Sequence, residues 1–121
     1  MGADDVGVLG EASGEILGQA AATFGLLASS ARLRILRVLA QGESDVAHLA
    51  DRVGGALSTI SQHLSALRRC GLVGVRKDGR RRVFFIEDPA VVEVVRLVVE
   101  QVARRVEAQT VAAGEGRRGM P

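Results

Sequence analysis

The side chains best suited to chemistry lie in one short stretch, LSTISQHLSALRRCG, at residues 57–71. Its apolar residues have the spacing of one helix face, and they are Leu57, Ile60, Leu64 and Leu67. The opposite face carries hydroxyls, an amide and a guanidinium, from Ser58, Thr59, Ser61, Gln62, Ser65 and Arg69. Such groups can hydrogen-bond the base edges and phosphates of DNA, whereas a carboxylate would be repelled. No acid occurs between residues 56 and 77, so this face is predicted to contact DNA.

A strongly basic segment begins at the end of this predicted helix. It contains a single acid, Asp78, against Arg68, Arg69, Arg76, Lys77, Arg80, Arg81 and Arg82. Over the whole chain, 16 basic residues against 14 acidic ones give a net charge of only +2. The positive charge is therefore concentrated beside the predicted DNA-contacting face, where it can neutralise phosphates.

These groups need a scaffold, and the spacing of apolar residues predicts one. Besides the helix at about 57–70, helical spacing indicates helices at 15–28, 29–42, 44–54 and 91–108. Ser44 is the expected N-cap of the third of these five helices. Two apolar runs, 72–75 and 83–86, flank Asp78-Gly79, which is a strong β-hairpin turn signal. Two short helices followed by a basic hairpin predict a winged helix-turn-helix, an α+β fold that is mainly α.

The helix predicted at 91–108 has two different faces. One is a polar stripe in which neighbours can form ion pairs, made of Glu93, Arg96, Glu100 and Arg104. The other is an apolar stripe made of Val91, Val95, Val98, Val102 and Val106. A domain this small cannot cover so long an apolar face, so we expect it to pack against a second copy of the chain. The alternative is that the stripe lies on the chain's own core.

The length and composition of the chain predict one small folded domain. Its 121 residues are 47% hydrophobic, and with no Trp or Tyr the core must be aliphatic. The ordered domain is expected at 14–109, between flexible tails at 1–13 and 110–121. The single cysteine excludes an intramolecular disulfide, the N-terminus is unlike a signal peptide, and no apolar run is long enough to span a bilayer. A cytoplasmic protein without membrane association is therefore predicted.

The stretch from residue 15 to about 108 resembles the ArsR/SmtB family of bacterial winged-helix repressors. The resemblance rests on the run STISQHLSALRRCGLV and on the wing sequence RKDGR. It implies a homodimer, joined through its first and last helices, that binds an inverted repeat in a promoter and represses transcription until an inducer weakens the complex. By this resemblance Phe24 joins the valine stripe in the dimer interface. It also places Ser58, Thr59, Ser61, Gln62 and Ser65 on the recognition helix, and Lys77, Arg80 and Arg81 at the wing tip.

The metal sites known in that family are not matched by this sequence. The positions of one Cys-x-Cys site hold Asp45 and Ala47. A site on the last helix is reduced to Asp88, because its other positions hold Ala90, Gln101 and Arg104. A lone carboxylate does not hold a transition metal. No metal and no cofactor are therefore predicted.

Cys70 is the one candidate sensor, and three interpretations of it are open. It can pack at the end of its helix, as most lone cysteines do. It can be a redox-sensitive thiol, because Arg68 and Arg69 beside it would favour the thiolate. It can also bind a soft metal, with further ligands from His63, His48 or another subunit.

No nucleophile-base arrangement and no glycine-rich phosphate loop is present in the sequence, so the chain is not expected to be an enzyme. A rival hypothesis is a winged-helix module that docks a different protein through its apolar last helix. The basic wing favours DNA instead.

Overall fold

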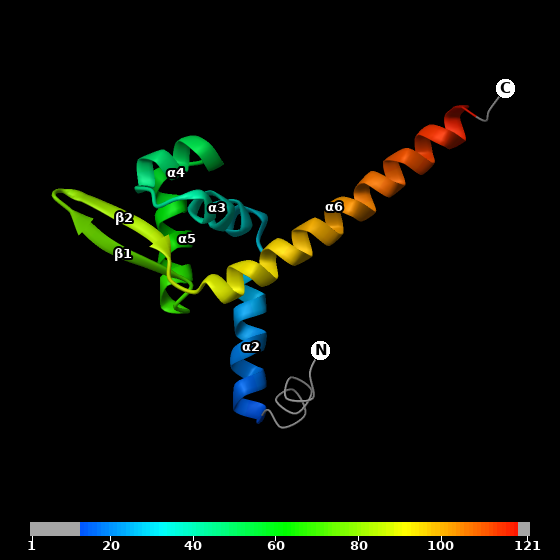
Figure 1. Ribbon diagram of the computed structural model, residues 1–121. Helices are drawn as coiled ribbons and strands as arrows, with labels where there is room; N and C mark the ends of the chain where they lie inside the picture. Colours follow the sequence, from blue (N-terminus) through cyan, green and yellow to red (C-terminus); the bar gives the residue numbers. More distant parts are fainter. Residues whose placement is uncertain (1–12, 119–121) are drawn as a thin grey trace.

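A computed structural model describes residues 13–118 of the chain (Figure 1). In chain order the elements are α2 (Gly14–Leu27), α3 (Ser30–Gln41), α4 (Val46–Val53), α5 (Leu57–Arg69), β1 (Val73–Asp78), β2 (Arg81–Ile86) and α6 (Pro89–Arg118). The predicted class, five helices with a two-stranded hairpin, is confirmed for these residues. No described helix is long and apolar enough to cross a membrane.

The hydrophobic core lies where α3, α4, α5 and the base of the hairpin meet. Its central side chains are Leu27, Ile35, Leu36, Leu39, Leu49, Ile60, Leu64, Leu67, Leu72, Val73 and Phe84. The core is aliphatic except for Phe84, as the composition predicts. In contrast, α2 and most of α6 extend away from this body (Figure 1). The core therefore fixes α5 and the hairpin relative to each other, while the two outer helices leave apolar side chains exposed.

The start of α4 differs from the sequence prediction. Asp45, not Ser44, is the N-cap, and its carboxylate accepts a hydrogen bond of 2.9 Å from the backbone N–H of His48. Ser44 is unavailable for this role because its backbone pairs with Phe84 of β2, through N–H···O contacts of 3.1 and 2.8 Å. The chain before α4 therefore forms an isolated antiparallel β-bridge to β2 at the edge of the hairpin.

The hairpin turns at Gly79 and Arg80, one residue later than the Asp78-Gly79 signal suggested. The strands are antiparallel, and Asp78 pairs with Arg81 at the tip. Gly79 has a φ of 65°, whereas Arg80 has a negative φ. This combination corresponds to a type II′ turn, whose first central residue is preferentially glycine. The conformation required of Gly79 explains why the turn forms there.

Gly74 in β1 leaves room for an aromatic side chain. A Cβ placed on Gly74 would lie 2.5 Å from the Phe85 ring and 2.3 Å from the Glu87 carboxylate. We therefore expect Gly74→Ala to lower the free energy of unfolding by about 1–3 kcal/mol, the usual cost of overpacking. Urea denaturation would measure this effect. Gly42→Ala is the matched control, because a Cβ there meets nothing within 4 Å. Equal stabilities for the two variants would show that Phe85 moves aside without cost.

Helix α6 differs from the sequence prediction in two ways. It continues to Arg118, past the predicted helix end at 108 and past the expected domain boundary at 109. Isolated glycines such as Gly114 cost a helix only about 1 kcal/mol each, which is too little to end it. In addition, Val91 and Val95 are half-buried against the chain's own core, because the first turns of α6 lie over it after leaving β2. The predicted N-terminal tail lies outside the described residues except for Ser13, which caps α2.

Candidate nucleic-acid interface

Helix α5 has one buried and one exposed face. Its buried residues are Ile60, Leu64, Ala66 and Leu67. The six residues predicted to contact DNA are all exposed, namely Ser58, Thr59, Ser61, Gln62, Ser65 and Arg69. Leu57 does not belong to the buried face as predicted, because it is 56% exposed in the first turn. The structure therefore brings the short hydroxyls, the amide and Arg69 onto one accessible side of a helix anchored by its other side.

The N-terminus of α5 is left without a side-chain cap. The caps of the other helices are Ser13, Ser29, Asp45 and Asp88, each accepting a hydrogen bond from a backbone N–H of the first turn. In α5 the N-cap is Ala56, which has no side chain able to do so. The N–H groups at a helix start carry a partial positive charge and attract anions. The first turn of α5 therefore presents donors next to Ser58 and Thr59.

His63 links α5 to α2 and α3 through Arg32. Its Nδ1 accepts a hydrogen bond of 3.1 Å from Nε of Arg32, and Arg32 also donates to the Leu26 carbonyl at 3.0 Å. One guanidinium thus ties together the end of α2, the start of α3 and the middle of α5. The sequence suggested His63 as a further ligand for a metal at Cys70, and the structure shows its Nδ1 as the hydrogen-bond acceptor of Arg32.

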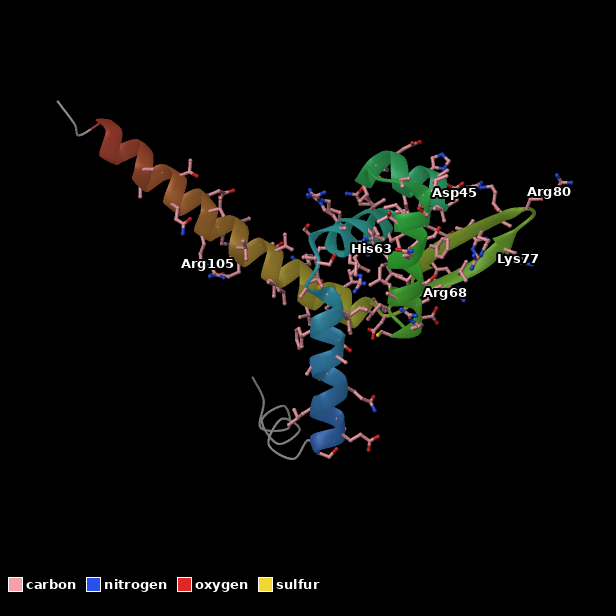
Figure 2. The ribbon with its side chains drawn as sticks, turned by 180° about the vertical axis from the view of Figure 1, so that it is seen from behind. Asp45, His63, Arg68, Lys77, Arg80 and Arg105 are labelled. Atoms are coloured by element: carbon pink, nitrogen blue, oxygen red, sulfur yellow. The ribbon has the colours of Figure 1, made fainter. Side chains whose placement is uncertain are left out.

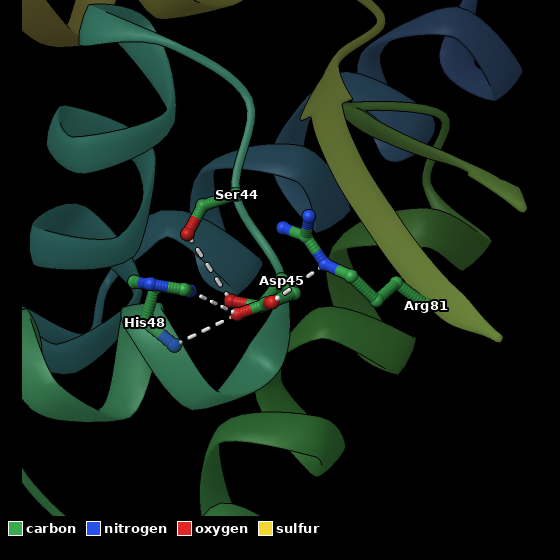
Figure 3. Close-up of polar contacts among 4 residues, drawn as sticks. All are labelled: Ser44, Asp45, His48 and Arg81. Carbon is green, nitrogen blue, oxygen red and sulfur yellow. Dashed lines mark hydrogen bonds and ion pairs between the residues drawn. The ribbon is translucent and has the colours of Figure 1, made fainter. Parts of the chain in front are cut away.

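The wing arginines are divided between internal ion pairs and solvent. Arg76 binds both carboxylate oxygens of Glu43, at 3.1 and 2.7 Å. Arg81 reaches from β2 to Asp45, with Nε 3.1 Å from Oδ2 (Figure 3). Lys77 and Arg80 are exposed, and no ion pair is found for either among the described residues. Figure 2 shows Arg80 at the tip of the hairpin. Of the three wing residues predicted to contact DNA, Arg81 is thus the one that already forms an ion pair within the chain.

Asp45 joins the wing to α4, because its carboxylate contacts both Arg81 of β2 and His48 of α4. Its side chain is 17% exposed, and its Oδ1 also lies 2.7 Å from Nδ1 of His48. Hydrogen bonds from the backbone and side chain of His48, aided by the charge of Arg81, lower the pKa of Asp45 to about 2. The carboxylate is therefore ionised at neutral pH, and its stabilising contacts are lost only when the pH falls below the ordinary Asp pKa towards that value. A similar contact with Arg76 lowers the pKa of Glu43.

A separate apolar surface is formed by α2 and α6. Phe24, Val98 and Val102, three of the predicted dimer residues, are 61%, 55% and 44% exposed. Val95 and Val98 also line an open apolar hollow together with Phe24, Leu27, Ala28, Leu33, Val94 and Val99. The predicted polar stripe on α6 is present, because Arg96 pairs with Glu93 and Glu100. These pairs lower the pKa of Glu93 and raise that of Arg96.

Cys70 is exposed at the C-terminal end of α5, which does not favour the first of its three interpretations, packing at the helix end. Residues 13–114, whose side chains are described, contain no group of three or more His, Cys, Asp or Glu side chains that could hold a metal ion. His48 is paired with Asp45, and His63 with Arg32.

Sequence reasoning missed the residues that hold the interface together. Glu43, Asp45 and Arg32 were not identified as contributors, because their partners are 31 to 36 residues away along the chain. A local signal existed only for Asp45, since an Asp just before an apolar helical run is a typical N-cap.

Comparison with known proteins agrees with this geometry. The sequence profile of the family described as "Bacterial regulatory protein, arsR family" matches residues 29–75, which run from the cap of α3 into β1. The HTH-type transcriptional regulator Rv0081 of Mycobacterium tuberculosis is 38% identical over 96 residues, covering 78% of this chain and 83% of the relative. A probable mercury resistance operon repressor of Streptomyces lividans is 35% identical over 74 residues, covering 61% of this chain and 59% of that protein.

Solved structures show the same fold. The crystal structure of M. tuberculosis Rv0081 has a TM-score of 0.71 with 32% identity and covers 81% of this chain and 99% of its own. The homodimeric winged helix-turn-helix DNA-binding domain of Mb0332 from Mycobacterium bovis has a TM-score of 0.72 with 35% identity. The match covers 81% of this chain and 94% of that domain. The chain therefore belongs to the arsR family of bacterial regulatory proteins, as a winged helix-turn-helix transcriptional regulator.

Proposed function

We propose that this regulator is a homodimeric repressor that binds an inverted-repeat DNA operator. Each protomer inserts the exposed face of α5 into a major groove, and its wing lies against the adjacent phosphates. The observation that carries the proposal is the acid-free exposed face of α5, with its hydroxyls and amide, beside the exposed wing cations Lys77 and Arg80.

The chemistry of α5 suits the reading of bases. Gln62 can form two hydrogen bonds with adenine, and the serine and threonine hydroxyls can approach either bases or phosphates. The uncapped N–H groups of the first turn favour a phosphate at the start of the helix. Because Ile60, Leu64 and Leu67 are buried, the helix is held rigidly while its opposite face is presented.

The assembly as a homodimer is supported by the exposed valines and Phe24 on α2 and α6, and by the homodimeric state of the similar Mb0332 domain. A pair of recognition helices related by a two-fold axis calls for a palindromic site. Repression, rather than activation, is proposed because the similar Streptomyces lividans protein is a probable repressor.

The test is selection of binding sites from a random duplex library, followed by fluorescence anisotropy. We expect enriched sequences with two-fold symmetry and half-sites about one helical turn apart. Affinity for the selected operator should exceed that for a scrambled duplex by at least about 10³. Transcription in vitro from a promoter overlapping the operator should fall when the protein is added. Equal affinity for both duplexes would overturn the proposal.

The uncapped start of α5 allows stability and DNA binding to be changed in opposite directions. We expect Ala56→Asp to raise the free energy of unfolding by about 0.5–2 kcal/mol, because it supplies the missing N-cap. The same carboxylate faces the proposed phosphate, so affinity for DNA should fall on the order of tenfold at low salt. Thermal unfolding and anisotropy measure the two effects.

Ala56→Ser is the matched control for this variant, because it caps the helix without adding charge. Its stability should rise while DNA affinity stays within a few-fold of the wild type. If Ala56→Asp binds DNA as tightly as Ala56→Ser, no phosphate lies at the start of α5.

A further inference from the structure

Three consecutive residues before α4 each bind the wing. Glu43 pairs with Arg76 on β1, and Asp45 pairs with Arg81 on β2. Between them, the backbone of Ser44 exchanges two hydrogen bonds with Phe84. Figure 3 shows Asp45 between Arg81 on one side and His48 of α4 on the other. We call residues 43–45 the wing clamp.

The register of the hairpin separates its cations into two sets. Arg76 is opposite Val83 and Asp78 is opposite Arg81, so the side chains of Arg76 and Arg81 leave the same face of the hairpin. Lys77 is opposite Arg82, and this pair leaves the other face. The wing clamp engages only the first set. Arg80 lies in the turn, outside both sets.

Each carboxylate oxygen of Asp45 has its own partner. Its Oδ1 accepts from the backbone and side chain of His48, which leaves Oδ2 for Arg81. An exposed ion pair alone contributes little to stability. Here, however, the backbone bridge at Ser44 already fixes the distance between the loop and β2, so the pairs form with little additional ordering. A DNA phosphate that draws the Arg81 guanidinium towards itself must compete with a carboxylate that the start of α4 holds in position.

We infer that the wing clamp positions the wing relative to the helix-turn-helix and keeps Arg76 and Arg81 away from DNA. Glu43 and Asp45 are positioning residues in this scheme. The phosphate contacts of the wing then come from Lys77, Arg80 and Arg82. This inference rests on the proposed DNA-binding function and refines it, because it removes Arg81 from the contacts that the sequence predicts.

The experiment measures affinity against salt concentration for the selected operator and for a scrambled duplex. In the wild-type background, Arg80→Ala should flatten the plot of log affinity against log salt by about 0.9, the value of one phosphate contact. Arg81→Ala should leave this slope unchanged. If Arg81→Ala flattens the salt dependence as much as Arg80→Ala does, the inference is overturned. This comparison leaves residues 43–45 unaltered.

The second part of the experiment breaks the ion pair between Asp45 and Arg81 by substitution. Asp45→Asn keeps a good N-cap for α4 but removes the charge that holds Arg81. We expect the salt slope to steepen by about 0.9, as the freed arginine finds a phosphate. The preference for operator over scrambled duplex should fall several-fold, because the wing is no longer fixed. Glu43→Gln combined with Asp45→Asn should enlarge both effects.

Asp51→Asn is the matched control, since it removes one negative charge from α4 at an exposed position without touching the wing. Its salt slope should equal that of the wild type. A slope in Asp51→Asn as steep as that in Asp45→Asn, or an unchanged slope in Asp45→Asn, would overturn the inference. Failure of the proposed function looks different, because the wild-type protein itself would then show no preference for any operator.

Discussion

Val98→Glu should convert the protein to a monomer and lower its affinity for the operator by about 10² to 10⁴. Val98 is 55% exposed in the isolated chain, so the change leaves the protomer fold intact. In a two-fold interface the substitution places two unpaired carboxylates in an apolar contact, which is strongly unfavourable. Without the dimer, the second half-site is no longer bound within the same complex, and the loss of effective concentration has the stated size. Analytical ultracentrifugation and anisotropy measure the two quantities.

Ala103→Glu is the control for this change. Ala103 follows Arg96 by seven residues and so lies on nearly the same side of α6 as the polar stripe. The Ala103→Glu substitution adds the same charge to the same helix. We nevertheless expect this variant to remain dimeric and to bind the operator as the wild type does. A Val98→Glu protein that sediments as a dimer would show that α6 does not form the interface through this face.

Gln62→Ala should reduce discrimination between bases while leaving non-specific binding intact. Gln62 is exposed at the centre of the polar face of α5, so its removal does not disturb the core. A bidentate contact between glutamine and adenine contributes roughly 1–3 kcal/mol of discrimination. We therefore expect operator affinity to fall by roughly 5- to 150-fold, with affinity for the scrambled duplex unchanged. Anisotropy with operators carrying single base-pair changes would identify the position at which specificity is lost.

Arg80→Ala provides the contrasting result, because a phosphate contact carries no sequence information. It should weaken binding to the operator and to the scrambled duplex by the same factor. If Gln62→Ala also weakens both duplexes equally, Gln62 contacts the DNA backbone and base reading must come from other residues on α5.

Local periodicity was sufficient to predict the elements that carry the proposed function. Helix α5 was predicted to within one residue, because its apolar residues fall on one face and its end is marked by Gly71. The hairpin was predicted from two apolar runs around a glycine turn. Helix α6 was correctly identified despite its many valines, because the charges of Glu93, Arg96 and Glu100 recur at helical spacing.

Predictions failed where a residue's role depends on distant parts of the chain. Val91 and Val95 belong to the same sequence stripe as Val98 and Val102, yet they pack inward because α6 starts above the core. Leu57 continues the apolar spacing of α5 but is exposed, since it lies at the very start of the helix where the core does not reach.

By itself, the sequence determined which side chains face one another within a helix or hairpin, because helical and strand periods are properties of the local backbone. It therefore identified the polar face of α5 and the basic hairpin beside it. Only the tertiary structure decided which of the wing cations form ion pairs within the chain and which are left to contact DNA. Glu43 and Asp45 meet Arg76 and Arg81 across 33 and 36 residues of chain, and such a pairing is set by the packing of the loop before α4 along β2. No pattern of neighbouring residues encodes that contact.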